Sequence, residues 1–303
     1  MMQYVLETRD LVKRYGSRTA LDGFSLNIPR GAVMGLVGEN GAGKTTWMLS
    51  VAGLLRLDSG EVNLLGRGPF RAALHSGRIS LLPQDSALPS ESRVQTMLYR
   101  LARMQGMGHA QAVQSTRWVL GAMDIADRAK SSVRSLSHGM RMRCLIAQCF
   151  IGNPELVILD EPLNGLDPVQ AQRVRAFLKA RAGRQTIVIS SHNLHDIEAL
   201  CTHVAFVEKG RVSKMSTLGA ITGAQNLLNY TLRRQPAIPK LEELLPGAQF
   251  EWKEREGILS CLIRDSGVQI EEVNRRLLPY LADACGVLSV SSGQSLEKAY
   301  FGR

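Results

Sequence analysis

Residues 38–45 of the chain read Gly-Glu-Asn-Gly-Ala-Gly-Lys-Thr and fit the pattern G-x-x-x-x-G-K-[ST]. An apolar run at residues 33–37 precedes this stretch and indicates a buried strand, and a helical pattern over residues 44–54 follows it. In that context the glycines let successive backbone N–H groups face one point, and the helix N-terminus adds partial positive charge there. The stretch therefore predicts a loop that binds the phosphate groups of a nucleotide.

Single residues of this loop have separate expected roles. Lys44 can reach the β- and γ-phosphates of ATP, and the hydroxyl of Thr45 is placed to ligate Mg²⁺. The alternative is a glycine-rich turn with an incidental lysine, but the flanking strand and helix argue against it. The residues of the loop that we expect to bind ATP are Gly38, Asn40, Gly41, Gly43, Lys44, Thr45 and Thr46.

A second motif, at residues 156–161, reads Leu-Val-Ile-Leu-Asp-Glu. Four apolar residues indicate a buried strand that delivers two carboxylates to its end, at the edge where open α/β sheets bind ligands. We expect Asp160 to hold Mg²⁺ through water. Glu161 is the next residue, so its side chain points elsewhere, and it is placed to orient or deprotonate the water that attacks ATP.

Strand and helix patterns alternate along the chain to about residue 215. Continuous apolar strands are indicated at residues 33–37, 79–82, 156–159 and 186–189, and a hairpin is indicated around residues 209–210. Apolar strands separated by helices favour an α/β fold, with a parallel sheet covered by helices on both faces.

The character of the chain changes after about residue 222. Strands are indicated at residues 228–232, 249–253, 258–263 and 287–290, and helices at residues 241–245 and 268–282. This order, β-α-β-β-α-β, is typical of small ferredoxin-like α+β modules. We therefore divide the chain into domains of residues 1–222 and 223–303, and we expect a final docking helix over residues 295–301.

Further short motifs narrow the class of protein. Residues 136–140, Leu-Ser-His-Gly-Met, resemble the LSGGQ signature of the ABC ATPase family, and residues 163–167 resemble the D-loop of that family. Tyr15, Gln84 and His192 match its adenine-stacking aromatic, its Q-loop glutamine and its switch histidine. The chain thus resembles an ABC ATPase over residues 2–220, which implies a P-loop NTPase fold with an ABC-type helical subdomain at about residues 85–150.

The resemblance implies how the site works. In this family two such domains face each other head to tail with ATP between them, so Ser137 and Gly139 would contact the γ-phosphate of the partner's ATP. Ser137 would also cap the helix that begins at His138. The implied catalytic residues are Glu161, His192 and Gln84; the implied metal site is Thr45, Gln84 and Asp160; Tyr15 would stack on adenine.

The signature departs from the family pattern at two places, because His138 replaces the first glycine and Met140 replaces the glutamine. Similar variants occur in the branch of ABC-2-type exporters. The resemblance therefore implies an exporter whose membrane permease subunits are separate chains, received by the helical subdomain. The dimer is a homodimer or a heterodimer, since an altered signature can pair with an intact one.

Composition fits a folded protein that does not itself cross a membrane. No window holds about 18 uninterrupted apolar residues, and the first ten residues lack the pattern of a signal peptide. The five cysteines are odd in number and form no C-x-x-C pair, which indicates reduced thiols. We expect a cytoplasmic protein, peripheral on the inner face of the cell membrane.

Two other functions compete with a transport motor. The net charge of +10 slightly favours a nucleic-acid or translation-linked ABC ATPase. Such proteins usually carry a second ATP domain, a long coiled coil or zinc modules, none of which this sequence has, so no nucleic acid is expected. A regulatory subunit that binds ATP without turnover usually loses the acid, the histidine or the signature serine, and all three are present here.

Overall fold

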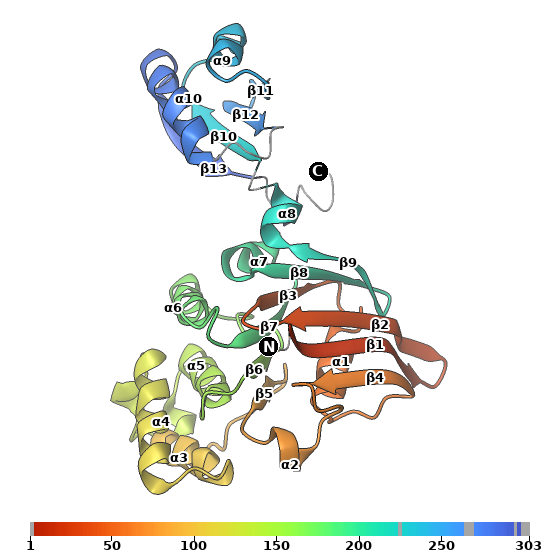
Figure 1. Ribbon diagram of the computed structural model, residues 1–303. Helices are drawn as coiled ribbons and strands as arrows, with labels where there is room; N and C mark the ends of the chain where they lie inside the picture. The colour runs from red at the N-terminus through yellow and green to blue at the C-terminus, as the bar shows by residue number, and fades with distance from the viewer. Residues whose placement is uncertain (1–2, 224–225, 264–269, 294–295, 298–303) are drawn as a thin grey trace. The chain divides into compact units, whose positions relative to one another are not determined.

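The computed structural model describes residues 3–223, 226–263, 270–293 and 296–297 (Figure 1). The chain divides into two compact units, Met1–Met215 and Ser216–Arg303. The predicted domain boundary, between residues 222 and 223, lies one short helix further along. Within the described ranges, no helix combines the length and the apolar character needed to cross a bilayer.

A six-stranded sheet forms the centre of the first unit, in the order β5-β6-β7-β3-β8-β9. Its strands are β5 (Ile79–Leu82), β6 (Leu156–Leu159), β7 (Thr186–Ser191), β3 (Val33–Val37), β8 (His203–Glu208) and β9 (Arg211–Thr217). The pairs β5/β6, β6/β7, β7/β3 and β3/β8 are parallel. The four predicted apolar strands and the hairpin are confirmed, and the parallel register brings the ends of β3, β6 and β7 to one edge.

A three-stranded antiparallel sheet, in the order β2-β1-β4, makes up the rest of this unit's β-structure. It consists of β1 (Tyr4–Tyr15), β2 (Arg18–Pro29) and β4 (Ser59–Leu64). The sequence analysis did not predict this sheet, because charged residues and bulges interrupt the period of its strands.

Helix α1 (Lys44–Val51) shares one hydrophobic core with both sheets. Its Trp47 is fully buried and stacks on Phe24, with ring centroids 5.7 Å apart. The indole Nε1 donates to Thr8 Oγ1 at 3.3 Å, so the one polar atom of this large side chain has an acceptor. The core thereby fixes the helix that begins at the phosphate loop.

The expected helical segment is present between β5 and β6. It contains α3 (Val94–Met104), α4 (His109–Ala122), α5 (His138–Cys149) and the 3₁₀ helices η1 (Ala126–Arg128) and η2 (Val133–Ser135). Arg143 of α5 is 2% exposed and its Nη1 donates to the carbonyl oxygens of Met123 and Asp124, each at 2.7 Å. These bonds satisfy carbonyl groups where α4 ends and tie α4 to α5. The other helices of this unit are α2 (Ala72–His75), α6 (Pro168–Lys179) and α7 (Leu194–Leu200).

The second unit begins with α8 (Leu218–Thr222) and then follows the predicted β-α-β-β-α-β order. Its elements are β10 (Leu227–Leu232), α9 (Ile238–Leu244), β11 (Ala248–Lys253), β12 (Ile258–Ile263), α10 (Ile270–Ala284) and β13 (Val287–Ser292). The sheet order is β11-β12-β10-β13, with antiparallel neighbours throughout. The helix expected over residues 295–301 lies outside the described residues except at 296 and 297.

Candidate functional site

The phosphate loop between β3 and α1 packs so closely against neighbouring strands that two of its glycines have no room for a side chain. A Cβ on Gly38 would lie 2.3 Å from the carbonyl oxygen of Val207 in β8. Gly43 has φ +110°, and a Cβ there would lie 2.6 Å from the carbonyl oxygen of Ala20 in β2. The N–H of Gly210 donates to the carbonyl of Ala42 at 2.9 Å. The loop is therefore wedged between two strands, and glycine is required at both positions.

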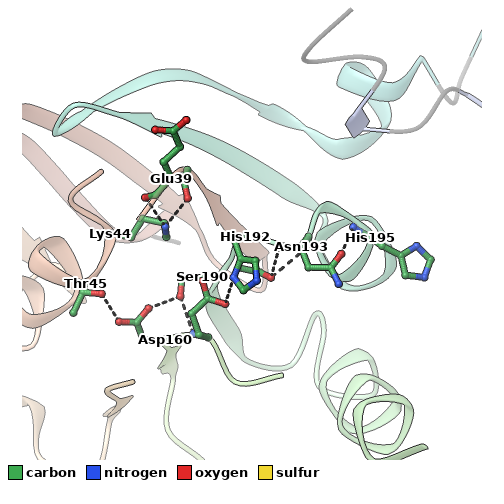
Figure 2. Close-up of polar contacts among 11 residues, drawn as sticks. Glu39, Lys44, Thr45, Asp160, Ser190, His192, Asn193 and His195 are labelled. Atoms are coloured by element: carbon green, nitrogen blue, oxygen red, sulfur yellow. Dashed lines mark hydrogen bonds and ion pairs between the residues drawn. The ribbon is translucent and has the colours of Figure 1, made fainter. Parts of the chain in front are cut away.

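Lys44 is the first residue of α1 and lies over this loop. Its Nζ donates to the carbonyl oxygens of Gly38 at 2.6 Å and Glu39 at 3.1 Å (Figure 2). The side chain is 6% exposed. Burial lowers the pKa of Lys44, while the nearby carboxylates of Glu161 and Asp160 oppose that shift. A buried ammonium beside carbonyl oxygens is well placed to exchange them for the stronger acceptors of a phosphate group.

A chain of hydrogen bonds links α1 to the ends of β6 and β7 (Figure 2). Thr45 Oγ1 donates to Asp160 Oδ2 at 2.6 Å, and Ser190 Oγ donates to Asp160 Oδ1. The backbone N–H of Glu161 donates to Ser190 Oγ at 2.8 Å. Each oxygen of the Asp160 carboxylate thus accepts one hydrogen bond, one from α1 and the other from β7. We call Thr45, Asp160, Ser190 and Glu161 the strand-end network.

Glu161 and His192 extend this network. The chain turns sharply at Glu161, whose φ is +50°, a left-handed conformation that costs a non-glycine residue about 1–2 kcal/mol. His192 Nδ1 lies 3.1 Å from Glu161 Oε2 and 3.2 Å from Oε1 (Figure 2). The glutamate side chain is 9% exposed and the histidine side chain 59% exposed. The pair therefore places one buried and one accessible titratable group beside Lys44 and Asp160.

The signature residues lie on a different part of the unit. Ser137 caps α5 as predicted, with its Oγ accepting from the N–H of Met140 at 3.3 Å. A Cβ on Gly139 would lie 3.1 Å from Gln170 Cγ of α6, and His138 Nε2 would lie 3.3 Å from a Cβ on Gly165. These contacts run to the D-loop and to the start of α6, where Asp167 caps the helix.

The remaining predicted residues make no hydrogen bond with the strand-end network in the described part of the chain. Gln84 is exposed, just beyond the end of β5. Tyr15 ends β1, is 49% exposed, and has Lys13 Nζ 5.5 Å from its ring centroid. Asn40 is exposed in the phosphate loop, and the carbonyl of Thr46 accepts from Ser50 Oγ at 2.8 Å.

The sequence analysis missed the parts played by two residues. Ser190 is fully buried and bridges Asp160 to the backbone of Glu161. A serine close to the end of the strand that leads to His192 was the available signal. Arg18 Nη2 donates to the carbonyl of Gly41 at 3.3 Å, a contact that no motif in the sequence indicates.

The donor set fits ATP and a divalent cation. The loop leads into the N-terminus of α1, where backbone N–H groups can bind phosphate oxygens, and Lys44 supplies a cation. Thr45 and Asp160 place a hydroxyl and a carboxylate oxygen 2.6 Å apart, and such hard oxygen ligands suit Mg²⁺. A phosphate loop combined with strand-end carboxylates defines a P-loop nucleotide-binding protein.

Comparison with known proteins specifies the family. The family model described as ABC transporter matches residues 21–164. The uncharacterized ABC transporter ATP-binding protein YhaQ of Bacillus subtilis is 31% identical, covering 87% of this chain and 85% of its own length. The Nod factor export ATP-binding protein I of Cupriavidus metallidurans is 35% identical, covering 69% of this chain and 70% of its own. A solved structure of the ATP binding subunit of an ABC transporter superimposes with a TM-score of 0.64 at 27% identity, covering 72% and 92% of the two chains.

The chain belongs to the family of ABC transporter ATP-binding proteins. Members of this family bind ATP and are ATPases, and their subunits work with membrane permease subunits.

The tight fit of the phosphate loop gives a test of the ATP site. Replacing Gly38 by alanine should force the loop away from Val207. If this displacement raises the free energy of ATP binding by about 1.4 kcal/mol, ATP binds about tenfold more weakly. The measurement is the dissociation constant of a fluorescent ATP analogue. Gly121→Ala is the matched control, because a Cβ at that helical glycine has no atom within 4 Å. Unchanged affinity in Gly38→Ala would show that the loop is not the binding site.

Proposed function

We propose that this chain is the ATP-hydrolysing subunit of an ABC exporter, acting as a dimer on separate membrane permease subunits. The observation that carries the proposal is the strand-end network, in which Thr45, Asp160, Ser190 and Glu161 are hydrogen-bonded within reach of Lys44 and His192. A cation, a hydroxyl and two carboxylates at the edge of one sheet are the groups that nucleotide hydrolysis requires.

Each side chain has a proposed part in hydrolysis. Lys44 binds the β- and γ-phosphates, and Tyr15 stacks on adenine. Glu161 accepts a proton from the attacking water or orients it, since the carboxylate lies beside His192 and is fixed by the turn at the end of β6. His192 holds that water and contacts the γ-phosphate. The other loop residues proposed to contact ATP are Gly38, Asn40, Gly41, Gly43, Thr45 and Thr46.

Mg²⁺ is the proposed cofactor, with Thr45, Asp160 and Gln84 as its holders. The metal supplies positive charge to the phosphate oxygens when it is bound. The 2.6 Å bond between Thr45 Oγ1 and Asp160 Oδ2 supports their shared role, because both oxygens already converge on one point.

The placement of the two halves of the site on different elements of one chain supports the proposed dimer. Ser137 caps α5 and Gly139 lies against Gln170 of α6, whereas Thr45 belongs to the network at the ends of β6 and β7. We infer that Ser137 and Gly139 complete the site of a second subunit across bound ATP. ATP then favours the closed dimer over the open one, and hydrolysis removes the bridge.

The exporter assignment rests on the relatives. One of the similar proteins is named for Nod factor export, and the chain shares 35% of its residues over most of both lengths. We propose the same direction of transport here, with the protein cytoplasmic and peripheral on the inner face of the membrane. The transported compound would be chosen by the permease.

A groove between α3 and α4, of about 560 Å³, supports docking of the permease on the helical segment. Tyr99 and His109 form one wall, with Tyr99 OH 3.0 Å from His109 Nδ1. Thr116 is 5% exposed, and its hydroxyl has no hydrogen-bond partner among the described residues. Arg117 lines the same groove, is exposed and forms no ion pair in the described part of the chain. A partner segment with an acidic or carbonyl group would pair with Arg117.

We further propose that residues 1–222 are the ATPase domain and residues 223–303 a ferredoxin-like accessory domain. The support for the second is its β-α-β-β-α-β order with a fully antiparallel sheet and two helices packed in its core.

Replacing Glu161 by glutamine tests the hydrolytic role. Because a general base contributes about 10²–10⁴-fold, turnover should fall by that factor, while ATP still closes the dimer. Size-exclusion chromatography with Mg-ATP should then show the variant as a dimer, whereas the wild type hydrolyses ATP and returns to the monomer. Wild-type turnover in Glu161→Gln would contradict the assigned role, and a monomer at all ATP concentrations would contradict the proposed dimer.

The transport role is tested with the same variant as bait on detergent-solubilised membranes. We expect a polytopic membrane protein to co-purify with Glu161→Gln in Mg-ATP, identified by mass spectrometry. Adding Arg117→Glu should reduce its recovery, because the charge in the groove is reversed. Arg56→Glu, the same change at an exposed position outside the groove, is the control. Recovery of ribosomes or nucleic acid alone would favour the translation-linked alternative.

A further inference from the structure

A second groove, of about 440 Å³, lies where α4 meets the residues that follow α5 and α6. It contains none of the residues assigned to the nucleotide site. Its polar and aromatic lining is Gln111, Gln114, Ser115, Trp118, Asn153 and Arg181. Arg181 is the one charged residue among the described residues that line it.

Two aromatic rings hold the guanidinium group of Arg181. Its Cζ lies 5.0 Å from the ring centroid of Trp118 and 6.0 Å from that of Phe177. Phe177 in turn packs edge-on against Phe150, with centroids 4.7 Å apart. The rings come from α4, from α6 and from the end of α5, so the platform is built by three helices. Cation–π contacts of this kind hold a guanidinium group in place and leave its accessible N–H groups to bind a partner.

The side-chain N–H groups of Arg181 have no acceptor within the described part of the chain. Its Nε is buried and without a hydrogen-bond partner, and no carboxylate there lies within ion-pair distance. Comparable half-buried arginines are paired: Arg78 lies 2.5 Å from Glu155, and Arg175 lies 2.6 Å from Asp196. The Nη groups of Arg181 are not among the buried atoms and have no partner in the described residues either, so they are the donors that an acceptor entering the groove can pair with.

Neutral donors surround this cation. Ser115 Oγ accepts from the N–H of Gly152 at 3.1 Å, so its own proton is free to be donated into the groove. Gln111 Oε1 accepts from the N–H of Gly108 at 3.3 Å, which leaves the amide NH₂ as the unoccupied end of the side chain. One fixed cation with hydroxyl and amide donors matches a planar, singly charged carboxylate. A phosphate monoester carries a charge of about −1.5 to −2 at pH 7, which this single cation does not balance.

We propose that this groove binds a carboxylate side chain of an acidic peptide segment belonging to a protein partner. The guanidinium edge of Arg181 pairs with the carboxylate, and the amide and hydroxyl groups bind its remaining lone pairs. Trp118, which is 36% exposed, provides an apolar wall for the neighbouring peptide side chain. The proposal is independent of ATP hydrolysis and concerns a second contact surface of the ATPase unit.

The test is a titration of the full-length ¹⁵N-labelled chain with acetyl-tetraglutamate amide, and separately with acetyl-tetraglutamine amide. The indole N–H signal of Trp118, assigned with Trp118→Phe, reports binding. We expect a saturable shift with the glutamate peptide that weakens as salt is added, and no shift with the glutamine peptide. Equal shifts with both peptides, or none with either, would overturn the proposal.

Two variants separate a built site from general attraction to a basic protein. Arg181→Gln should weaken binding by about tenfold or more, because a hydrogen bond to a charged group is lost. Arg184→Gln removes an exposed charge three residues away and should leave binding unchanged. Equal losses in both variants would overturn the proposal. Should Arg181→Gln fail to fold, Arg181→Lys keeps the charge and must still weaken binding, since lysine cannot pair bidentately.

Discussion

The site depends on the hydrogen-bonded carboxylate of Asp160. Thr45 from α1 and Ser190 from β7 each donate to one of its oxygens, and Ser190 also accepts from the backbone of Glu161. This single junction ties the phosphate loop, the acidic strand end and the strand that leads to His192. It exists because β6, β7 and β3 are parallel and adjacent, so that their ends meet at one edge.

The same junction explains why Glu161 can occupy a left-handed conformation. The bond from its N–H to Ser190 and the contact of its carboxylate with His192 hold both ends of the residue. Backbone strain of this kind persists where surrounding contacts determine the conformation, and such sites are often functional. The buried Trp47 and the glycines that pack against Val207 and Ala20 fix the opposite side, so little freedom remains around Lys44.

The sequence predicted the features with a strong local pattern. The apolar strands, the phosphate loop and the acidic strand end follow from short runs of residues, and Ser137 was correctly predicted to cap α5. The antiparallel sheet of β1, β2 and β4 was missed, because its charged, bulged strands have no clear period. The bridging part of Ser190 and the platform beneath Arg181 depend on contacts between distant segments, which no motif encodes.

The most direct measurement is the rate of Mg-ATP hydrolysis by Ser190→Ala, compared with Ser191→Ala as the matched control. Ser191 is the adjacent buried serine, and its hydroxyl contacts the backbone of Asn193 instead of the network. Loss of the Ser190 hydroxyl leaves a buried N–H without a partner, a cost of about 1–3 kcal/mol, so turnover should fall by about tenfold to a hundredfold. Equal, wild-type turnover in both folded variants would contradict the view that the strand-end network positions Glu161 for hydrolysis.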